Sequence, residues 1–388
     1  MNILYLDWPC FGREDVCAAL TGMGHHLIKF SHKDYTERES PSFQDAFDAL
    51  IRTTDIDCCF SYNYYPLLAE AANRHGIKYI SLVYDSPFVK LYSFTITYPT
   101  NYVFLFDYEL YHELRSGGIS TVYYSPLPVN ARSITEKLKT DYDRQRTTCE
   151  VSFVGSLYNE DHNLFDRMYE KLRPYTKGYL DAIMRAQLKI SGYNFIEEVL
   201  TPAIIDDLHK AEPYQNSRDG AETLANVYAN YYIDRKLTSI ERIQLLGAVS
   251  EQFPLKLFTL DPNADIPNAT NMGTTDYYNE MPLVFHNSKI NLNISLRSIK
   301  SGIPLRCMDI LGAGGFLLTN YQADLCRHFT ANEDFVYFED EANLLQKIKY
   351  YLSHEDERTS IARNGYEKVL EHYNYETVLS ELFSIAQV

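Results

Sequence analysis

The sequence has no run of about 18 apolar residues, the length that a membrane-spanning helix needs. It has no basic and then apolar leader ahead of the first predicted strand, which starts at Asn2. Positive charge is also scarce, because 36 lysines and arginines stand against 52 acidic residues and leave a net charge of −16. Nucleic acids and anionic lipids both attract basic surfaces, so this charge argues against either partner. These absences predict a cytoplasmic protein with no transmembrane segment.

Several signatures of metal, disulfide and cofactor sites are missing as well. The seven cysteines form no CxxC pair, which indicates reduced thiols, and the eleven histidines show no HExxH spacing. Neither a P-loop nor a G-x-S-x-G elbow occurs, and Gly22-x-Gly24 follows a predicted helix, where no dinucleotide would bind. Two D-x-D triplets, Asp55–Asp57 and Asp141–Asp143, lack the strand-end position of a metal–diphosphate site. We therefore expect no metal and no required cofactor.

Tyrosine is the abundant residue, with 33 copies against a single tryptophan. Many occur in runs, such as Tyr62–Tyr65 and Tyr228–Tyr232. Such side chains favour half-buried surfaces, where an apolar ring can pack and the hydroxyl can find a partner. The alternative is a set of stacking platforms for sugar rings, and composition alone does not choose between the two.

Short apolar runs alternate with helical segments along the chain, as in Ile3–Asp7, Glu14–Met23 and Tyr79–Val83. This βαβ pattern predicts parallel sheets covered by helices. A charged stretch near 131–148 interrupts it, and a long helical stretch follows the strand near 150–154. The predicted organisation is a Rossmann-like domain over 1–130, a linker over 131–148, a second such domain over 149–373 with a helical insertion at about 164–253, and a last helix over 374–388.

The most informative stretch is Ser288–Asn320, in which a strand leads through a basic loop into a helix that starts near Pro304. Helix amides and the helix dipole attract phosphate, and Gly302 allows close approach of the backbone. Basic side chains of this stretch could neutralise a pyrophosphate, and Asp309 could accept hydrogen bonds from ribose hydroxyls. The basic candidates are Arg297, Lys300 and Arg306. An ordinary βαβ crossover with solvated charges explains the same residues equally well.

A family resemblance adds to this interpretation. Residues 309–317 resemble the donor-site pattern E-A-M-A-x-G-x-P-V of GT-B glycosyltransferases, with Asp309 in place of Glu. The segments SLRSIKSGIPLR and LGAGGFLLTNY are similar to the spore-maturation CgeB-like branch in particular, strongly over 286–375, and residues 1–130 resemble more weakly the uncharacterised N-terminal domain of that branch. The resemblance implies two domains that face each other across a cleft, which Gly155 and Ser156 line. It also implies that the ribose of the donor binds at Asp309. The residues implied to contact the diphosphate are Ser301, Gly302, Ile303, Pro304, Leu305 and Arg306.

The sequence also departs from the family. Many retaining GT-B enzymes carry a second acid eight positions before the first, and here that position is Ser301. The basic pair expected after the first strand of the second domain is not evident beyond Gly155-Ser156. The stereochemistry of the family is therefore not carried over. A base for an inverting reaction is sought at the strand ends of the first domain, at Asp85 or at Asp7, with Trp8 and Tyr84 as candidates for stacking on an acceptor sugar.

The resulting hypothesis is a bacterial, cytoplasmic hexosyltransferase-like enzyme. It would move a sugar from a nucleotide-sugar donor, by default a UDP-sugar, to a glycan, protein or lipid acceptor without a metal. Two alternatives stay open. One is a non-catalytic protein that binds sugar nucleotides or serves as a partner on the same scaffold. The other is a GT-B-like sugar-nucleotide epimerase.

Overall fold

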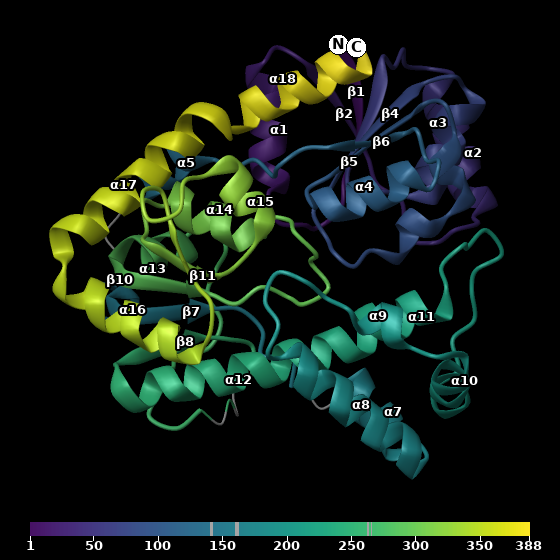
Figure 1. Ribbon diagram of the computed structural model, residues 1–388. Coiled ribbons are helices and arrows are strands. Elements are labelled where there is room, and N and C mark those ends of the chain that lie inside the picture. The colour runs from purple at the N-terminus through teal and green to yellow at the C-terminus, as the bar shows by residue number, and fades with distance from the viewer. Residues whose placement is uncertain (140–142, 160–162, 262–263, 265) are drawn as a thin grey trace. The chain divides into compact units, whose positions relative to one another are not determined.

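The computed structural model describes residues 1–388 except 140–142, 160–162, 262–263 and 265. Two compact units can be distinguished (Figure 1). Unit 1 contains Met1–Pro128, Gln215–Glu222 and His372–Val388, and unit 2 contains Val129–Tyr214 and Thr223–Glu371. Each unit is an α/β structure built on its own parallel sheet.

Unit 1 is built on a six-stranded parallel sheet with the order β2-β1-β3-β4-β5-β6. The four inner strands are short apolar runs that are buried on both faces, as is usual for a parallel sheet under helices, whereas the two edge strands are partly exposed. The strands are β1 (Asn2–Leu6), β2 (His26–Phe30), β3 (Cys58–Tyr62), β4 (Lys78–Val83), β5 (Asn101–Leu105) and β6 (Val122–Tyr124).

The helices of unit 1 begin at recognisable caps. Ser40 and Asp107 each accept a hydrogen bond from a backbone amide of the first helical turn, and Pro41 and Pro66 open two helices in which a missing N–H costs nothing. The helices are α1 (Arg13–Gly22), α2 (Pro41–Ile51), α3 (Pro66–Arg74), α4 (Tyr108–Ser116), the 3₁₀ turns η1 (Val89–Tyr92) and η2 (Phe94–Thr97), and α18 (Tyr375–Ala386).

The C-terminal helix α18 packs beside α1, and the two chain ends lie close together (Figure 1). The hydroxyl of Tyr62 donates to that of Tyr375 (2.9 Å), and Lys78 Nζ donates to the carbonyl of Gln387 (2.9 Å). Gly12 has a positive φ of 74°, and a Cβ there would lie 2.6 Å from the Tyr375 hydroxyl. Glycine at this position therefore allows both the turn and the close packing of α18.

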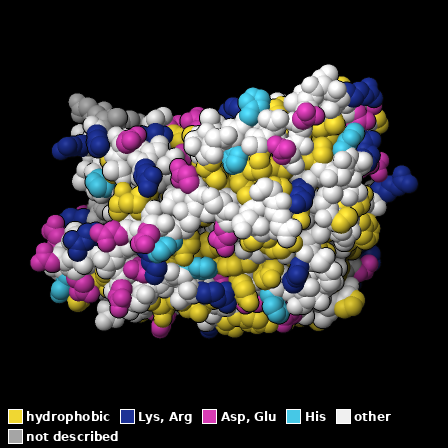
Figure 2. Space-filling view, turned by 90° about the horizontal axis from the view of Figure 1, so that it is seen from above, with side chains coloured by type: hydrophobic (Ala, Val, Ile, Leu, Met, Phe, Trp, Pro, Cys, Tyr) yellow, Lys and Arg dark blue, Asp and Glu magenta, His cyan; other side chains and the backbone are white. Residues whose placement is uncertain are grey.

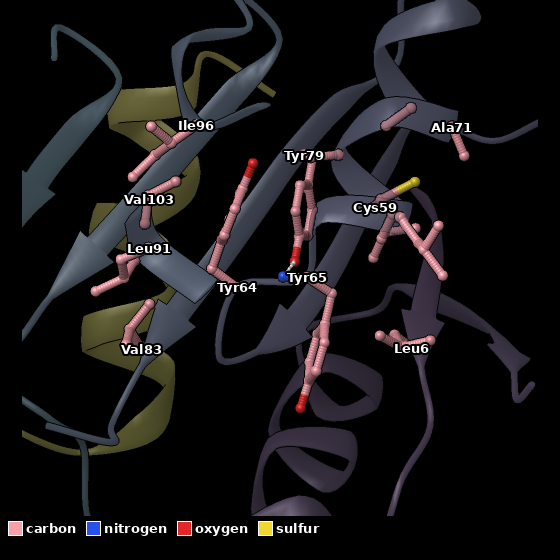
Figure 3. Packing of buried hydrophobic residues seen from close by; sticks show 14 of the residues in the cluster. Leu6, Cys59, Tyr64, Tyr65, Ala71, Tyr79, Val83, Leu91, Ile96 and Val103 are labelled. Carbon is pink, nitrogen blue, oxygen red and sulfur yellow. Dashed lines mark hydrogen bonds between the residues drawn. The ribbon is translucent and has the colours of Figure 1, made fainter. Parts of the chain in front are cut away.

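Tyrosines of the first run form part of the unit 1 core (Figure 3). The rings of Tyr64 and Tyr79 stack with centroids 5.8 Å apart. Both are fully buried, and the Tyr79 hydroxyl meets Ser61 Oγ (2.5 Å) and accepts from the Tyr65 amide (3.1 Å). These rings serve the core and are not exposed stacking platforms, because their hydroxyls find partners inside the protein.

Residues 215–222 belong to unit 1 although they lie within the helical stretch of the sequence. Gly220 forms an antiparallel bridge with Ser93, and the Phe94 amide donates to the Asp219 carbonyl (3.0 Å). Arg38 pairs with Asp219 (3.4 Å) and with Glu222 (3.8 Å). Ion pairs between distant segments thus hold this loop in unit 1.

Unit 2 contains the second six-stranded parallel sheet, with the order β12-β11-β10-β7-β8-β9. Its strands are β7 (Cys149–Val154), β8 (Leu255–Phe258), β9 (Thr270–Asn271), β10 (Ser288–Asn293), β11 (Leu317–Asn320) and β12 (Val336–Phe338). The helices in the same part of the chain are α12 (Asp234–Gln252), α13 (Met281–Asn287), α14 (Leu305–Gly312), α15 (Ala323–His328), α16 (Glu341–Ser353) and α17 (Glu355–His372).

The predicted helical insertion is present in unit 2 and has its own apolar core, which includes Tyr228 and Tyr232. A π-helical turn, η3 (Tyr228–Ile233), runs directly into α12. The preceding helices are α7 (Leu164–Glu170), α8 (Pro174–Gln187), α9 (Ile196–Val199), α10 (Pro202–Ala211) and α11 (Leu224–Val227).

The stretch that we expected to be a linker is helical in its described part. It contains α5 (Ala131–Lys137) and α6 (Arg144–Thr147), both in unit 2. Asn130 caps α5 by accepting from the Ser133 amide (3.1 Å), and Arg146 forms an ion pair with Glu280. One charge of the stretch in which we predict a linker therefore binds a distant segment. Asp141 of the second D-x-D triplet lies outside the described residues.

Gly365 of α17 is expected to tolerate no side chain. A Cβ at this position would press on the Asp334 carbonyl and lie 2.7 Å from Leu311 Cδ2. We expect Gly365→Ala to lower the free energy of unfolding by about 1–3 kcal/mol through overpacking. Gly178→Ala on α8 is the matched control, because nothing lies within 4 Å of its Cβ position and alanine favours helix by about 1 kcal/mol. Thermal denaturation should separate the two variants in opposite directions, and equal melting temperatures would contradict this packing.

Candidate functional site

The carboxyl ends of β7 and β10 lie at the point where the strand order of unit 2 reverses. From β7 the chain continues to β8 on one side, whereas β10 pairs with β7 on the other. In open parallel sheets such a switch point is the place where ligands bind. Gly155 and Ser156 follow β7, and Ile294 and Ser295 follow β10, so two of the predicted residues lie at this point.

Arg242 of α12 joins these two strand ends, and sequence reasoning missed it. Its guanidinium donates to the carbonyl of Ser156 (2.5 Å) and to that of Ile294 (3.0 Å), and it lies about 5 Å from the ring centres of Phe153 and Tyr158. The residue is only 8% exposed, and burial lowers the pKa of its guanidinium. Among the described residues no carboxylate forms an ion pair with Arg242, although the charge of Glu241 favours the charged guanidinium from a greater distance.

A signal for Arg242 does exist in the sequence. Leu245, Leu246 and Val249 form the apolar stripe of α12, and all three are buried. Arg242 lies three and four residues before the two leucines, so it falls on the same stripe. A basic residue on a buried stripe needs a local partner for its charge, which makes it a candidate for function.

The loop after β10 leads into α14 at Leu305, one residue later than Pro304. Pro304 takes the N-cap position with extended backbone (φ −59°, ψ 147°), and no side chain caps the helix start. Gly302 and Ile303 are buried along this loop. Ser301 is also buried, and its carbonyl accepts from the Asp324 amide (3.0 Å). The Cys307 amide donates to the Pro304 carbonyl (2.9 Å), and an anion at the start of α14 stays a prediction.

Arg306 and Asp309 lie together on the first turns of α14. Arg306 Nη1 is 3.5 Å from Asp309 Oδ2, and its guanidinium lies 5.5 Å from the Phe285 ring centre. Asp309 is almost fully buried, and its Oδ1 accepts from the Tyr277 hydroxyl (3.2 Å). Tyr277 is a further residue that the sequence analysis missed, because it precedes Asp309 by 32 positions and only folding brings them together.

Arg297 and Lys300 have different surroundings. Arg297 forms a two-pronged ion pair with Glu241 of α12 (2.5 and 2.8 Å) and donates to the Ile190 carbonyl (2.9 Å). Its guanidinium is therefore occupied by protein groups. Lys300 is half-buried and lines a small recess of about 20 Å³ together with Asn194 and Arg297.

In unit 1 the two acidic candidates have opposite electrostatic environments. Both oxygens of Asp7 accept from Arg13 (2.5 and 2.7 Å), and this hydrogen bonding holds the pKa of the Asp7 carboxyl below its usual range. Asp85 follows β4 and accepts from Asn63 Nδ2 (2.7 Å). It is open to solvent on one side, yet burial by the surrounding protein raises the pKa of its carboxyl group, against the effect of the Asn63 hydrogen bond. Asp85 is therefore the better base of the two.

The aromatic candidates lie in a cluster near the same strand ends. Trp8 stacks on Tyr35 with centroids 5.8 Å apart and donates from Nε1 to the Tyr62 carbonyl (3.4 Å). Tyr84 meets the Tyr62 ring edge-on at 5.4 Å, and burial raises the pKa of its hydroxyl. Both candidates are half-buried, so each keeps some surface that a ligand could contact.

The discounted signals lie away from these strand ends. Asp57 accepts from the Asn2 amide (2.6 Å), at the amino end of β1. Within the part of the chain that the structure describes, no group of three or more His, Cys, Asp and Glu side chains could hold a metal ion. All seven cysteines are free, and four of them are buried. Of the described helices, none combines the length and the apolar character needed to span a bilayer.

Charged side chains are mixed on the face drawn in Figure 2. The described lysines and arginines lie scattered among acidic side chains there, with hydrophobic side chains between them. On this face, the described residues form no broad basic patch of the kind that a nucleic acid needs.

Comparison with known proteins finds a family match over part of the chain. Residues 235–384 match the model of the glycosyl transferase-like family. This match covers α12 with Arg242, the loop after β10, and α14 with Arg306 and Asp309. Among curated proteins, no relative of the chain is detected.

Solved structures with the same fold span the whole chain. Sucrose-phosphate synthase from Thermosynechococcus elongatus is 12% identical with a TM-score of 0.53, over 100% of this chain and 98% of that one. A glycosyltransferase from Rickettsia africae is also 12% identical, with a TM-score of 0.56 over 100% and 97%. HepE from Anabaena in complex with UDP-glucose is 10% identical, with a TM-score of 0.55 over 100% and 99%. The predicted α/β fold of GT-B type, with two parallel sheets, is confirmed.

Proposed function

We propose that this chain is a glycosyltransferase of the CgeB-like branch that moves a sugar from a nucleotide-sugar donor to an acceptor. The donor is a UDP-sugar, and residues 149–373 bind it. Residues 1–130 bind the acceptor, which is a glycan, a protein or a lipid. The enzyme is hexosyltransferase-like, bacterial and cytoplasmic.

The buried Arg242 carries this proposal. A guanidinium held between two strand ends, with carbonyls and aromatic rings as its described contacts, calls for an anion nearby. The uncapped start of α14 supplies amides and the positive end of a helix dipole. Arg306 adds a second cation beside that start. A diphosphate is the anion whose size and charge suit such a set of donors.

The remaining residues suggest how the donor is held and used. Asp309 and Tyr277 would bind the ribose hydroxyls, because the carboxylate is buried within reach of the helix start. Charge on the departing diphosphate would be met by α14 amides, Arg306 and Arg242 without a bound metal. Asp85 would take the proton from the acceptor hydroxyl. UDP-glucose, the ligand named for HepE, supports a UDP-sugar as the donor to test first.

One observation favours a second candidate function. Ser301 stands where many family members carry an acid, and its side chain is buried. A protein that binds sugar nucleotides without transferring the sugar would need no acid there. Nucleotide binding without release of UDP from any acceptor mixture would favour this non-catalytic reading, whereas release of UDP in the absence of an acceptor would favour an epimerase.

The deciding experiment is thermal stabilisation by nucleotides. The melting temperature is measured with UDP, GDP, ADP and UDP-glucose on the wild type, on Asp309→Ala and on Asp356→Ala, whose carboxylate is exposed on α17. A ligand at a hundredfold excess over its dissociation constant stabilises the folded state by about 2.7 kcal/mol. We expect a shift with the uridine nucleotides in the wild type and in Asp356→Ala, and a much smaller shift in Asp309→Ala. No shift with any nucleotide would overturn the proposal.

A further inference from the structure

Asp234 is a buried carboxylate that the proposed function does not use. It is the first residue of α12, directly after the π-helical turn η3, and it is 1% exposed. Its Oδ2 accepts from Asn194 Nδ2 (2.7 Å). Its Oδ1 is buried with no hydrogen-bond partner among the described residues. Burying an ionised carboxylate with one oxygen unbonded lowers the free energy of unfolding, so a functional reason for Asp234 is worth seeking.

The surroundings of Asp234 lead to the loop after β10. Asn194 Nδ2 also donates to the carbonyl of Arg297 (2.9 Å). On the other side of the same residue, the Arg297 amide donates to Thr238 Oγ1 (2.9 Å), which in turn donates to the Asp234 carbonyl (2.7 Å). Asp234 is thus connected to both backbone groups of Arg297, in the loop that we propose to hold the diphosphate.

Charged groups face Asp234 from several elements. Arg297 and Lys300 of the loop favour its ionised form, whereas Glu197 of α9 disfavours it. The other charges near the start of α12 have partners: Glu241 pairs with Arg297, Lys236 pairs with Asp166 of α7, and Arg235 lies over the Tyr158 ring. Arg297 and Lys300 are thus the cations whose charge favours an ionised Asp234.

Protonation of Asp234 lies within reach at neutral pH. Burial raises the pKa of its carboxyl group to about 7, while the Asn194 hydrogen bond and the charge of Arg297 act in the opposite direction. An anion bound beside Lys300 would add negative charge near Asp234. Nearby negative charge favours the protonated form of a carboxyl group, so the two events reinforce each other.

We propose that Asp234 is a positioning residue of the loop after β10 and that binding of a nucleoside diphosphate at this loop is coupled to uptake of a proton by Asp234. In the empty protein the charges of Arg297 and Lys300 favour the ionised carboxylate. The protonated form keeps one oxygen as an acceptor for Asn194 and removes negative charge from the neighbourhood of the diphosphate. This inference rests on the proposed function, because it needs the diphosphate to bind at this loop.

The test uses UDP-glucose, whose diphosphate diester does not titrate near neutral pH. Its affinity is measured by titration calorimetry across neutral pH for the wild type, for Asp234→Asn and for Glu197→Gln. We expect the affinity of the wild type to fall as pH rises through 7, by at most about tenfold per pH unit because one proton is involved. Asp234→Asn should bind at high pH as tightly as the wild type does at low pH. Glu197→Gln should keep the pH dependence.

Two further readouts do not depend on the size of the affinity. Calorimetry in buffers of different ionisation enthalpy should show proton uptake on binding in the wild type and none in Asp234→Asn. Without ligand, the raised pKa means that the folded state holds the proton more tightly than the unfolded chain, so this contribution to stability is lost as pH rises from about 4 to about 7. In Asp234→Asn, the free energy of unfolding should not show this decrease between about pH 4 and about pH 7.

The possible failures can be told apart. Affinity that is independent of pH in the wild type, or that has the same pH profile in Asp234→Asn, would overturn the role of Asp234 and leave the proposed function standing. A uniform loss of affinity in Asp234→Asn at every pH would indicate a structural role only. Absence of nucleotide binding in the wild type at any pH would overturn both proposals.

Discussion

Replacing Arg242 by methionine is expected to abolish nucleotide binding and to lower the melting temperature of the protein. The substitution keeps the length and the apolar stem of the side chain but removes the guanidinium that holds the Ser156 and Ile294 carbonyls. Buried hydrogen bonds to a charged group contribute about 1.5–3 kcal/mol. We expect a loss of about 2–4 kcal/mol in the free energy of unfolding. Thermal denaturation with and without UDP measures both effects.

Arg235→Met is the matched control for this experiment. Arg235 lies on the same helix and over the same Tyr158 ring at 5.0 Å, but it is half-buried. Loss of this contact should cost less than about 1 kcal/mol and leave the shift by UDP in place. Arg242→Lys keeps the charge but has no planar fork to reach both carbonyls, so we expect intermediate stability and weak binding. Unchanged UDP affinity in Arg242→Met would contradict the assignment of this cation to the diphosphate.

Replacing Asp85 by asparagine is expected to reduce kcat by about 10²–10⁴ while leaving donor binding unchanged. The amide is nearly the same size and keeps the contact with Asn63, but it cannot accept a proton. Release of UDP from UDP-glucose, with the best acceptor found in a panel of simple glycosides, reports the turnover. Melting with UDP reports binding separately.

The pH profile sharpens this prediction. A base must be ionised to act, so kcat should rise with pH through the pKa of Asp85, which lies above the ordinary value for an aspartate. Asp7→Asn, at the end of β1 in the same sheet, is the matched control. The pKa of Asp7 is lowered by its bond to Arg13, so it is a weak base and its replacement should affect kcat much less. Equal losses in the two variants would remove Asp85 from the role of base.

The sequence indicates where the loop lies, but it does not indicate which of the arginines near it are available to a diphosphate. Arg297 and Arg306 show why. Both arginines were predicted to neutralise a pyrophosphate. Arg306 lies at the open start of α14 beside Asp309, whereas Arg297 is held by Glu241, which is 56 positions earlier in the chain. The partner of a long, flexible side chain is whichever group folding brings within reach, and local spacing carries no information about it.

The tyrosine runs and the expected linker make the same point about burial. Tyr64 and Tyr79 are in the core because their hydroxyls find Thr95 and Ser61 there. The stretch after Val129 is helical because Asn130 caps it and Thr135 bonds to Tyr366, more than 200 positions away. Composition alone predicts half-buried rings and a charged linker, because the partners of these side chains are not adjacent in sequence.

The sequence by itself determined the alternation of strands and helices, the helical insertion, and the place of the loop and helix that carry Asp309. These features depend on local periodicity and on residues such as proline and glycine that act where they stand. Only the tertiary structure decided that Arg242 joins two strand ends and that Tyr277 reaches Asp309. It also decided that Asn194 connects Asp234 to the loop after β10. Each of these contacts joins segments far apart in the chain, and its energy depends on burial and on distance through space, which no local pattern encodes.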